Sequence, residues 1–189
     1  FDHVVNNLGP HMLPLIGRAD WNDCLNLNCF SWDPNESFQT TENKTEGSKA
    51  ESLMIAGLFV VCGRDYVELC RERGLAEEAE RAQKLVDDMV EAVKKHGWDG
   101  EYYLDAYNDD DDKLGSHLCE EGAMFLIPQL WAVISGIGVD GRELIAMQSV
   151  EEKLSTPLGT RIMYPSYVTP NSRIGVITTK PAGVQENGG

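Results

Sequence analysis

Two stretches in the first half of the chain repeat apolar residues at the spacing of an amphipathic helix. From about Lys49 to Arg73 apolar side chains recur at near-helical intervals, and Gly74 follows as a stop signal. The stretch from about Ala76 to His96 carries one apolar and one charged face, and Gly97 follows it. The pattern predicts two consecutive helices, and we interpret the charges of the second as a solvated surface.

Two further helices are predicted beyond the middle of the chain. The first covers about Phe125 to Ile137. The second begins at Asp140 and runs to about Leu154, and Glu143 would complete a capping box at its start. In a capping box, two side chains accept backbone N–H groups that the helix leaves unpaired, so we expect this helix to begin with its end groups satisfied.

The remaining segments lack helical periodicity. Residues 1–47 are rich in Asn, Pro, Gly, Asp and Thr with recurring aromatic residues, which indicates a long ordered loop region of the kind that carries function. We expect residues 98–107 to be extended, the acidic run 109–112 to form a solvated turn, and residues 155–189 to include short β-type runs such as 173–179. Helix pairs separated by long loops predict a mainly α, layered or toroidal fold with the active loops at one end of the helices.

The strongly negative net charge of the chain argues against some classes of binding partner. The 189 residues include 16 Lys and Arg against 31 Asp and Glu, a formal net charge of −15. Nucleic acid and anionic membrane surfaces repel such a chain, so we expect neither as a partner. No apolar run approaches the length of a bilayer span, and no signal peptide is recognisable.

The cysteines and histidines indicate no metal site. Five cysteines are an odd number and form no CxxC pair, so we expect free thiols in a cytoplasmic protein and no metal or organic cofactor. The histidines are isolated, and we expect surface or satisfied polar residues at His11, His96 and His117. Because the chain starts without Met and ends at Gly189, we expect residues 1–189 to be an internal fragment of a single domain.

The candidate chemistry lies around Trp21, which Asp20 and Asp23 flank. A carboxylic acid beside an aromatic ring suits glycosidic cleavage, because the ring can stack on a sugar face and an apolar wall would raise the pKa of the acid that protonates the leaving oxygen. On composition alone, an Asx-rich turn whose carboxylates cap backbone amides is the more common explanation.

A resemblance to a known family reverses this preference. The segment from His11 to Ser31 reads HMLPLIGRADWNDCLNLNCFS and closely resembles the active-site region of cellobiose and chitobiose phosphorylases, glycoside hydrolase family 94. The resemblance covers essentially the whole chain and continues through Glu36–Thr41, Lys49–Ser52, Gly97–Glu101, Glu120–Gly122, Tyr164–Tyr167 and Glu186–Gly189.

The resemblance implies a fold and an activity. The catalytic domain would be an (α/α)6 barrel with long active-site loops, and residues 1–189 would be one part of it. Members are large bacterial enzymes, usually homodimers, that cleave a β-linked disaccharide such as cellobiose with inorganic phosphate and invert the product to an α-sugar 1-phosphate. Phosphate would be a co-substrate, and no cofactor is implied.

The resemblance also implies roles for particular residues. Asp23 would be the general acid, Trp21 would line the sugar site, and Glu186 would bind the acceptor-side sugar. Phosphate is already an anionic nucleophile, so no second carboxylate is required as a base, and we expect a supporting role for Asp20. The family's phosphate site lies largely outside these residues, so we expect this polypeptide alone to be inactive.

The C-terminal segment bears on the acceptor sugar. Residues 154–185 contain no Asp or Glu, but they contain Arg161, Arg173 and Lys180. Cellobiose phosphorylases tend to carry Tyr and Lys where this chain has Lys180 and Gln185. A cationic pocket would suit an acidic leaving sugar such as gluconate, which keeps a cellobionic acid phosphorylase open beside a cellobiose or N,N'-diacetylchitobiose phosphorylase. The slightly favoured alternative is that these cations pair with acids on neighbouring loops.

Two other classes of function remain open at this point. An inverting hydrolase on the same kind of barrel would need a carboxylate to activate water, and Glu120 or Glu121 would be the candidates. A non-catalytic carbohydrate-binding module would use Trp21 and Trp32 as stacking platforms.

Overall fold

The computed structural model describes residues 1–16, 27, 32–36, 48–138 and 140–189, and the fold is mainly α. Its α-helices are α1 (Asp2–Val5), α3 (Leu53–Glu72), α4 (Ala76–Ala92), α5 (Leu126–Ser135) and α6 (Arg142–Lys153). A π-helical turn η2 (Val93–Gly97) continues α4, and short 3-10 helices are η1 (Pro34–Glu36) and η3 (Val176–Thr179). The strands, each of two residues, are β1 (Glu51–Ser52), β2 (Ala106–Tyr107), β3 (Lys113–Leu114), β4 (Met124–Phe125), β5 (Ser155–Thr156), β6 (Gly159–Thr160) and β7 (Met163–Tyr164).

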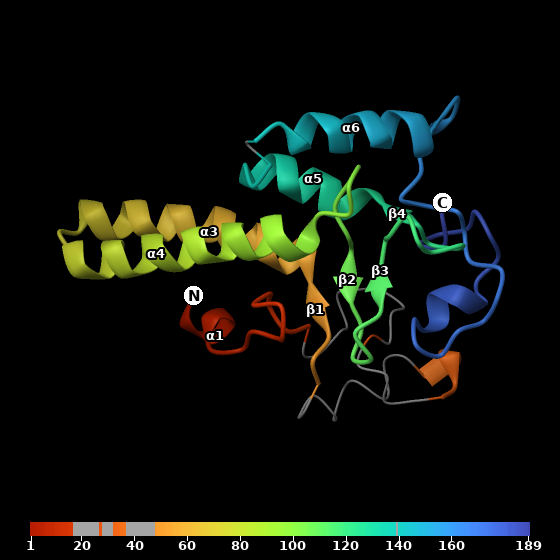
Figure 1. Ribbon diagram of the computed structural model, residues 1–189, viewed down its shortest axis with the longest axis horizontal. Coiled ribbons are helices and arrows are strands. Elements are labelled where there is room, and N and C mark those ends of the chain that lie inside the picture. The colour runs from red at the N-terminus through yellow and green to blue at the C-terminus, as the bar shows by residue number, and fades with distance from the viewer. Residues whose placement is uncertain (17–26, 28–31, 37–47, 139) are drawn as a thin grey trace.

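The long helices pack against one another in the order α4, α3, α5, α6. Figure 1 shows α3 and α4 side by side as a long hairpin, with α5 packed along α3 and α6 packed on α5. The backbones of α3 and α5 approach closely at Gly57, where a Cβ would lie 2.9 Å from the Cβ of Trp131. The C-terminal segment, drawn in blue, lies at the end of the molecule opposite the α3–α4 turn, and strands β1, β2 and β3 lie between them (Figure 1).

The two predicted amphipathic helices in the first half are confirmed, with changed ends. The first begins at Leu53 rather than Lys49, because Glu51 and Ser52 form β1 and the Ser52 hydroxyl accepts the N–H of Ile55 at 3.3 Å as an N-cap. The second ends its α-helical part at Ala92 and widens into the π-helical turn η2.

The third helix is confirmed as α5, which Gly136 ends in the left-handed conformation with φ 65°. The capping box predicted for the fourth helix is wrong. Helix α6 begins at Arg142, and its N-cap residue is Gly141, which has no side chain to accept a backbone N–H. Asp140 instead accepts the N–H of Arg142 at 3.4 Å, and one carboxylate oxygen of Glu143 is buried without a hydrogen-bond partner among the described residues.

The extended segments are shorter than the sequence predicts. Within residues 98–107 only β2 is a strand, and Trp98 forms an isolated bridge with Tyr103. The β-type run predicted at 173–179 is wrong, because this segment forms a turn followed by η3. The hydroxyl of Thr178 donates to the carbonyl of Gly175 at 2.8 Å, a local bond that competes with strand pairing.

The strands form small antiparallel sheets that join distant parts of the chain. The largest has the order β1–β2–β3, with Glu51 opposite Tyr107 and Ala106 opposite Leu114. On its other side Glu51 forms a bridge with Leu15. Strand β4 pairs with β7, and β5 pairs with β6. The acidic run after β2 forms the predicted turn that leads into β3.

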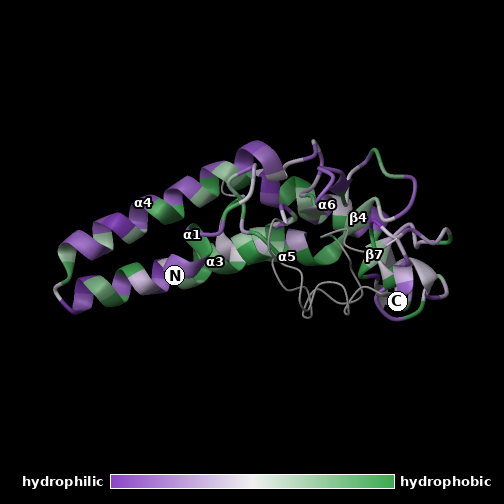
Figure 2. Ribbon diagram, turned by 90° about the horizontal axis from the view of Figure 1, so that it is seen from below, coloured by the Kyte–Doolittle hydropathy of each residue, from purple (hydrophilic) through white to green (hydrophobic). Residues whose placement is uncertain are grey.

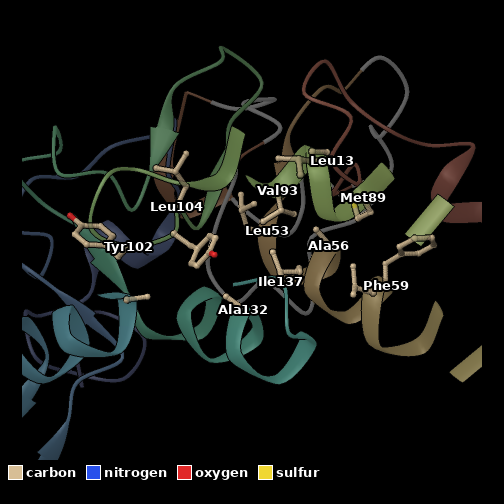
Figure 3. Close-up of a cluster of buried hydrophobic side chains, with 14 of the residues drawn as sticks. Leu13, Leu53, Ala56, Phe59, Met89, Val93, Tyr102, Leu104, Ala132 and Ile137 are labelled. Carbon is tan, nitrogen blue, oxygen red and sulfur yellow. The ribbon is translucent and has the colours of Figure 1, made fainter. Parts of the chain in front are cut away.

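The two largest hydrophobic clusters among the described residues support different parts of the fold. The larger one fills the space between the helices and the 102–107 segment (Figure 3), and it includes Leu53, Ala56, Phe59, Met89, Val93, Tyr102, Leu104, Ala132 and Ile137. The second cluster joins the sheet to the C-terminal segment and contains Ile16, Leu27, Ala50, Ala106, Leu114, Phe125, Met163, Tyr167 and Ile177. Residues on both sides of the Trp21 motif and residues of the C-terminal segment therefore pack in the same hydrophobic cluster.

The helices differ in how apolar their outer faces are. Figure 2 shows mostly hydrophilic residues along α4 and mostly hydrophobic ones along α5. On α5, Ile127, Leu130 and Ile134 follow a helical spacing and are 44%, 38% and 63% exposed. Within the part of the chain that the structure describes, no helix is both long and apolar enough to cross a bilayer.

Candidate functional site

The described residues that flank the Trp21 motif in the sequence are Ile16 and Leu27. Asp20, Trp21 and Asp23 themselves lie outside the described residues. On the N-terminal side, Ile16 is buried and donates its N–H to the carbonyl of Ala50 at 2.8 Å. On the C-terminal side, Leu27 is fully buried, and its carbonyl accepts the N–H of Asp109 at 2.7 Å. Both flanks are therefore held by the β1–β2 region.

The Glu186 loop is a tight turn over residues 183–189. The N–H of Gly183 bonds to the carbonyl of Asn187 at 2.8 Å, and the N–H of Gly189 bonds to the carbonyl of Gln185 at 2.8 Å. Gln185 is exposed and adopts a left-handed backbone with φ 51°. Gly188 also has a positive φ of 88°, and a Cβ there would lie 2.3 Å from the hydroxyl oxygen of Ser166. Only glycine fits at this approach.

Asn187 fixes this loop, a role that sequence reasoning missed. Its side chain is fully buried, and its Oδ1 accepts the N–H of Tyr167 at 2.7 Å. Its Nδ2 donates to the carbonyls of Tyr167 at 2.9 Å and of Lys180 at 2.8 Å. These bonds tie the segments around residues 167, 180 and 187 together. The signal in the sequence was the Asn of the Glu-Asn-Gly-Gly motif.

Glu186 and Lys180 are brought together as an ion pair. The ammonium group of Lys180 contacts Oε2 of Glu186, and the two side chains are 21% and 34% exposed. The hydrogen bond from Lys180 lowers the pKa of the Glu186 carboxyl below its ordinary value, because it stabilises the charged form. Glu186 is therefore a partly exposed carboxylate that can accept hydrogen bonds from hydroxyl groups.

The other two cations of the C-terminal segment differ in their surroundings. Arg173 pairs with Asp110 at 2.9 Å, and its guanidinium lies 3.9 Å from the centre of the Trp32 ring, whose residue is 79% exposed. Arg161 lies over the ring of Tyr164 at 4.6 Å and lines a surface groove with the 156–160 hairpin and the glycines of the Glu186 loop. Among the described residues Arg161 has no acid partner, whereas Arg173 and Lys180 each have one.

The carboxylate of Glu121 anchors residues 168–169 of the C-terminal segment through hydrogen bonds. Its Oε2 accepts the N–H of Val168 at 3.1 Å and that of Thr169 at 3.2 Å, and its Oε1 accepts the Thr169 hydroxyl at 3.1 Å. A carboxylate engaged by these donors anchors the loop rather than activating water. Glu120 is exposed.

Of the histidines for which a satisfied or surface position was predicted, His11 and His117 have carboxylate partners, which confirms the prediction for them. The Nδ1 atom of His11 lies 2.6 Å from Glu51, and that of His117 lies 2.6 Å from Asp99. His96 contacts His11 edge to face at 5.0 Å, and burial, followed by the charge of His11, lowers the pKa of His96.

The chain matches a known class of carbohydrate-active domain over its whole length. Residues 1–189 match the family model of the glycosyl hydrolase 94 superfamily, catalytic domain. The chain therefore belongs to this family, and the resemblance seen in its sequence is confirmed.

Several relatives of the chain are phosphorylases. Solabiose phosphorylase from Paenibacillus borealis is 36% identical over 186 residues, which are 96% of this chain and 22% of that protein. The 3-O-beta-D-glucopyranosyl-beta-D-glucuronide phosphorylase of the same organism is 30% identical over 99% of this chain and 22% of its own length. N,N'-diacetylchitobiose phosphorylase from Vibrio furnissii is 34% identical over 90% of this chain and 19% of its own length. The chain thus spans about a fifth of the length of these relatives.

Proposed function

We propose that the complete protein is an inverting disaccharide phosphorylase. It would transfer the glycosyl group of a β-linked disaccharide to inorganic phosphate and release an α-sugar 1-phosphate and a free sugar. The observation that carries this proposal is the match of the whole chain to the catalytic domain of a family in which the relatives above are phosphorylases.

In the proposed reaction Asp23 is the general acid and Trp21 forms the wall of the sugar site beside it. Asp23 donates its proton to the glycosidic oxygen as the bond from this oxygen to C1 breaks. A phosphate oxygen forms a bond to C1 from the opposite face, which inverts the configuration. No carboxylate base is needed, and the engagement of Glu121 by the 168–169 segment supports phosphorolysis over hydrolysis.

The acceptor side of the proposed site contains Glu186. Its carboxylate, whose pKa is lowered by the hydrogen bond from Lys180, would accept hydrogen bonds from hydroxyl groups of the leaving sugar. Gln185 precedes it on the exposed turn, and Arg161 lines the adjoining groove. The substrate that we propose first is a cellobiose-type disaccharide, and the alternatives are cellobionic acid and N,N'-diacetylchitobiose. A relative whose name includes a glucuronide supports keeping the acidic alternative.

We also propose that residues 1–189 form part of an (α/α)6 barrel. The apolar stripe of Ile127, Leu130 and Ile134 on α5 supports this, because such a face is stable when further helices cover it. The same family resemblance leads us to propose a cytoplasmic homodimer for the complete enzyme.

The test is an assay of the full-length protein with cellobiose, cellobionate and N,N'-diacetylchitobiose, each with and without phosphate. Sugar 1-phosphate that forms only when phosphate is present is the expected result. Release of free sugars without phosphate would favour a hydrolase, and no turnover would favour a carbohydrate-binding module. Synthesis from glucose 1-phosphate with a panel of free sugars then identifies the acceptor.

The role of Asp23 is tested by Asp23→Asn in the same protein. We expect turnover of the disaccharide to fall by about 100-fold or more, because general acid catalysis contributes on this scale. The melting temperature should stay close to that of the wild type. A substantial residual rate would contradict the assignment of Asp23.

A further inference from the structure

Glu51 is a fully buried residue whose carboxyl oxygens make three hydrogen bonds with one short segment. Its Oε1 accepts the N–H of His11 at 2.9 Å and that of Leu13 at 3.1 Å. Its Oε2 lies 2.6 Å from Nδ1 of the His11 ring. Burying a carboxylate is costly unless hydrogen bonds compensate it, so these contacts bind residues 11–13 firmly to Glu51.

The backbone before residue 14 is shaped around this carboxylate. The N–H of Gly9 bonds to the carbonyl of Leu13 at 2.8 Å, and Met12 has a left-handed φ of 60°. A Cβ on Gly9 would lie 2.5 Å from the carboxyl carbon of Glu51, so the turn closes directly onto the side chain. The loss of the carboxylate would leave the turn without the group around which it folds.

The imidazole of His11 is held by two further elements. Its ring stacks on Tyr107 of β2 at 3.9 Å between ring centres, and the Tyr107 hydroxyl donates to the carbonyl of His96 at 2.7 Å. On its other side, the Nε2 atom of His11 lies 3.6 Å from Asp111. His11 therefore connects the N-terminal segment to β2, to the end of the α4–η2 helix and to the acidic turn.

The chain that leaves this arrangement leads to the proposed general acid. The N–H of Ser52 bonds to the carbonyl of Pro14 at 3.0 Å, and the N–H of Ile16 bonds to the carbonyl of Ala50 at 2.8 Å. Asp23 follows Ile16 by seven residues. The same strand that carries Glu51 thus fixes both the turn at residues 9–13 and the last described residues before the motif.

We propose that Glu51 and His11 are positioning residues for the proposed reaction, which hold residues 9–16 on β1 and thereby fix the described end of the segment that precedes Asp23 in the sequence. This inference rests on the proposed function. Neither side chain is assigned a contact with substrate. Their role is to supply a rigid starting point for the segment that carries the acid, because small displacements of a catalytic group cost large factors in rate.

The test compares His11→Ala and Glu51→Gln in the full-length enzyme, with the disaccharide that the wild type cleaves best. For His11→Ala we expect kcat to fall by about 10- to 100-fold, with the KM values for disaccharide and phosphate within about twofold. Glu51→Gln keeps the shape and one acceptor oxygen for the two backbone N–H groups, so we expect a smaller loss than for Glu51→Ala. The matched control is His117→Ala, which removes another histidine–carboxylate pair and should leave kcat unchanged.

A second measurement separates misplacement of the acid from general damage. With a 2,4-dinitrophenyl β-glycoside of the same donor sugar, the leaving group departs without protonation, so the variants should lose less than about threefold. Equal losses on both substrates, or wild-type kcat in His11→Ala, would overturn the inference. If the wild type itself shows no phosphate-dependent turnover, the proposed function fails instead, so the two failures are distinguishable.

Discussion

At the scale of single residues, the fold contains buried carboxylates in contrasting surroundings. Glu51 is surrounded by donors, and Asp99 contacts His117, with Lys113 at 3.8 Å. Asp105 differs from both, because burial is the sole cause that raises its pKa, to about 7. A neutral carboxyl group is less costly to bury than a charged one, so the folded state favours the protonated form of Asp105.

This difference predicts a pH dependence of stability. The unfolded chain releases the Asp105 proton near the ordinary value of 3.8, whereas the folded chain retains it to about pH 7. Between these values Asp105 binds more protons in the folded state, so the contribution of this group to stability falls as the pH rises. We expect Asp105→Asn to remove this loss, with an advantage over the wild type that grows from pH 4 to pH 7 by on the order of 4 kcal/mol. Chemical unfolding of both proteins across this range measures it, and parallel curves would contradict it.

The acceptor can also be probed at single residues. If the leaving sugar is acidic, Arg161→Ala should raise the KM for cellobionate by roughly 10-fold, with little change for cellobiose, because a charge-assisted hydrogen bond is lost. Lys180→Ala should impair both substrates, because Glu186 loses the ion pair that holds its side chain. The acid limb of the pH profile should also move to higher pH, because the hydrogen bond from Lys180 lowers the pKa of the Glu186 carboxyl. Equal effects of Arg161→Ala on the two substrates would argue against an acidic acceptor.

At the scale of elements, the conformation of the Glu186 loop is held by hydrogen bonds within residues 183–189 and by packing on the end of β7. Asn187 binds the backbone at residues 167 and 180, and Gly188 packs on the end of β7. The turn therefore presents Glu186 from a rigid base. Loops of this kind tolerate substitutions at exposed positions, whereas substitutions at points of close contact destabilise the folded state.

Two glycines of this loop form a matched pair for testing that statement. Gly188 and Gly183 both have positive φ, but a Cβ at Gly188 would meet Ser166 and the Met163 carbonyl, whereas a Cβ at Gly183 would meet nothing within 4 Å. We expect Gly183→Ala to cost about 1 kcal/mol of unfolding free energy and Gly188→Ala about 2–4 kcal/mol, because the latter adds a clash to the backbone strain. Similar costs at both positions would show that packing under the loop is unimportant.

At the scale of the whole molecule, the helices leave an apolar surface that the described residues do not cover. The residues along α5 are mostly hydrophobic (Figure 2), and Ile134 is the most exposed residue of its apolar stripe at 63%. An exposed apolar stripe of this kind indicates an interface, and further helices of a barrel are the partner we propose.

The proposal predicts how the complete protein responds to a charge on this stripe. Ile134→Asp should destabilise the full-length protein by about 3 kcal/mol or more, because the aspartate would be buried against neighbouring helices. Leu158 in the β5–β6 hairpin is 100% exposed and provides the comparison. Leu158→Asp is expected to change the unfolding free energy by less than about 0.5 kcal/mol. If Ile134→Asp is equally neutral, the stripe faces solvent.

The sequence by itself determined the four long helices and the family, and only the tertiary structure decided the pairing of side chains around the site. Helices follow from near-neighbour periodicity, so α3 to α6 are recognisable from spacing alone, and the Trp21 motif is recognisable as a contiguous string.

The predicted capping box was wrong because Gly141 is the N-cap residue of α6, and the predicted strand at 173–179 was wrong because Thr178 bonds locally. Glu51 and His11 are 40 positions apart, and Arg173 and Asp110 are farther apart still, so no local pattern reports their contact. Such contacts arise when the chain folds back on itself, because burial selects which charged and polar groups must satisfy each other.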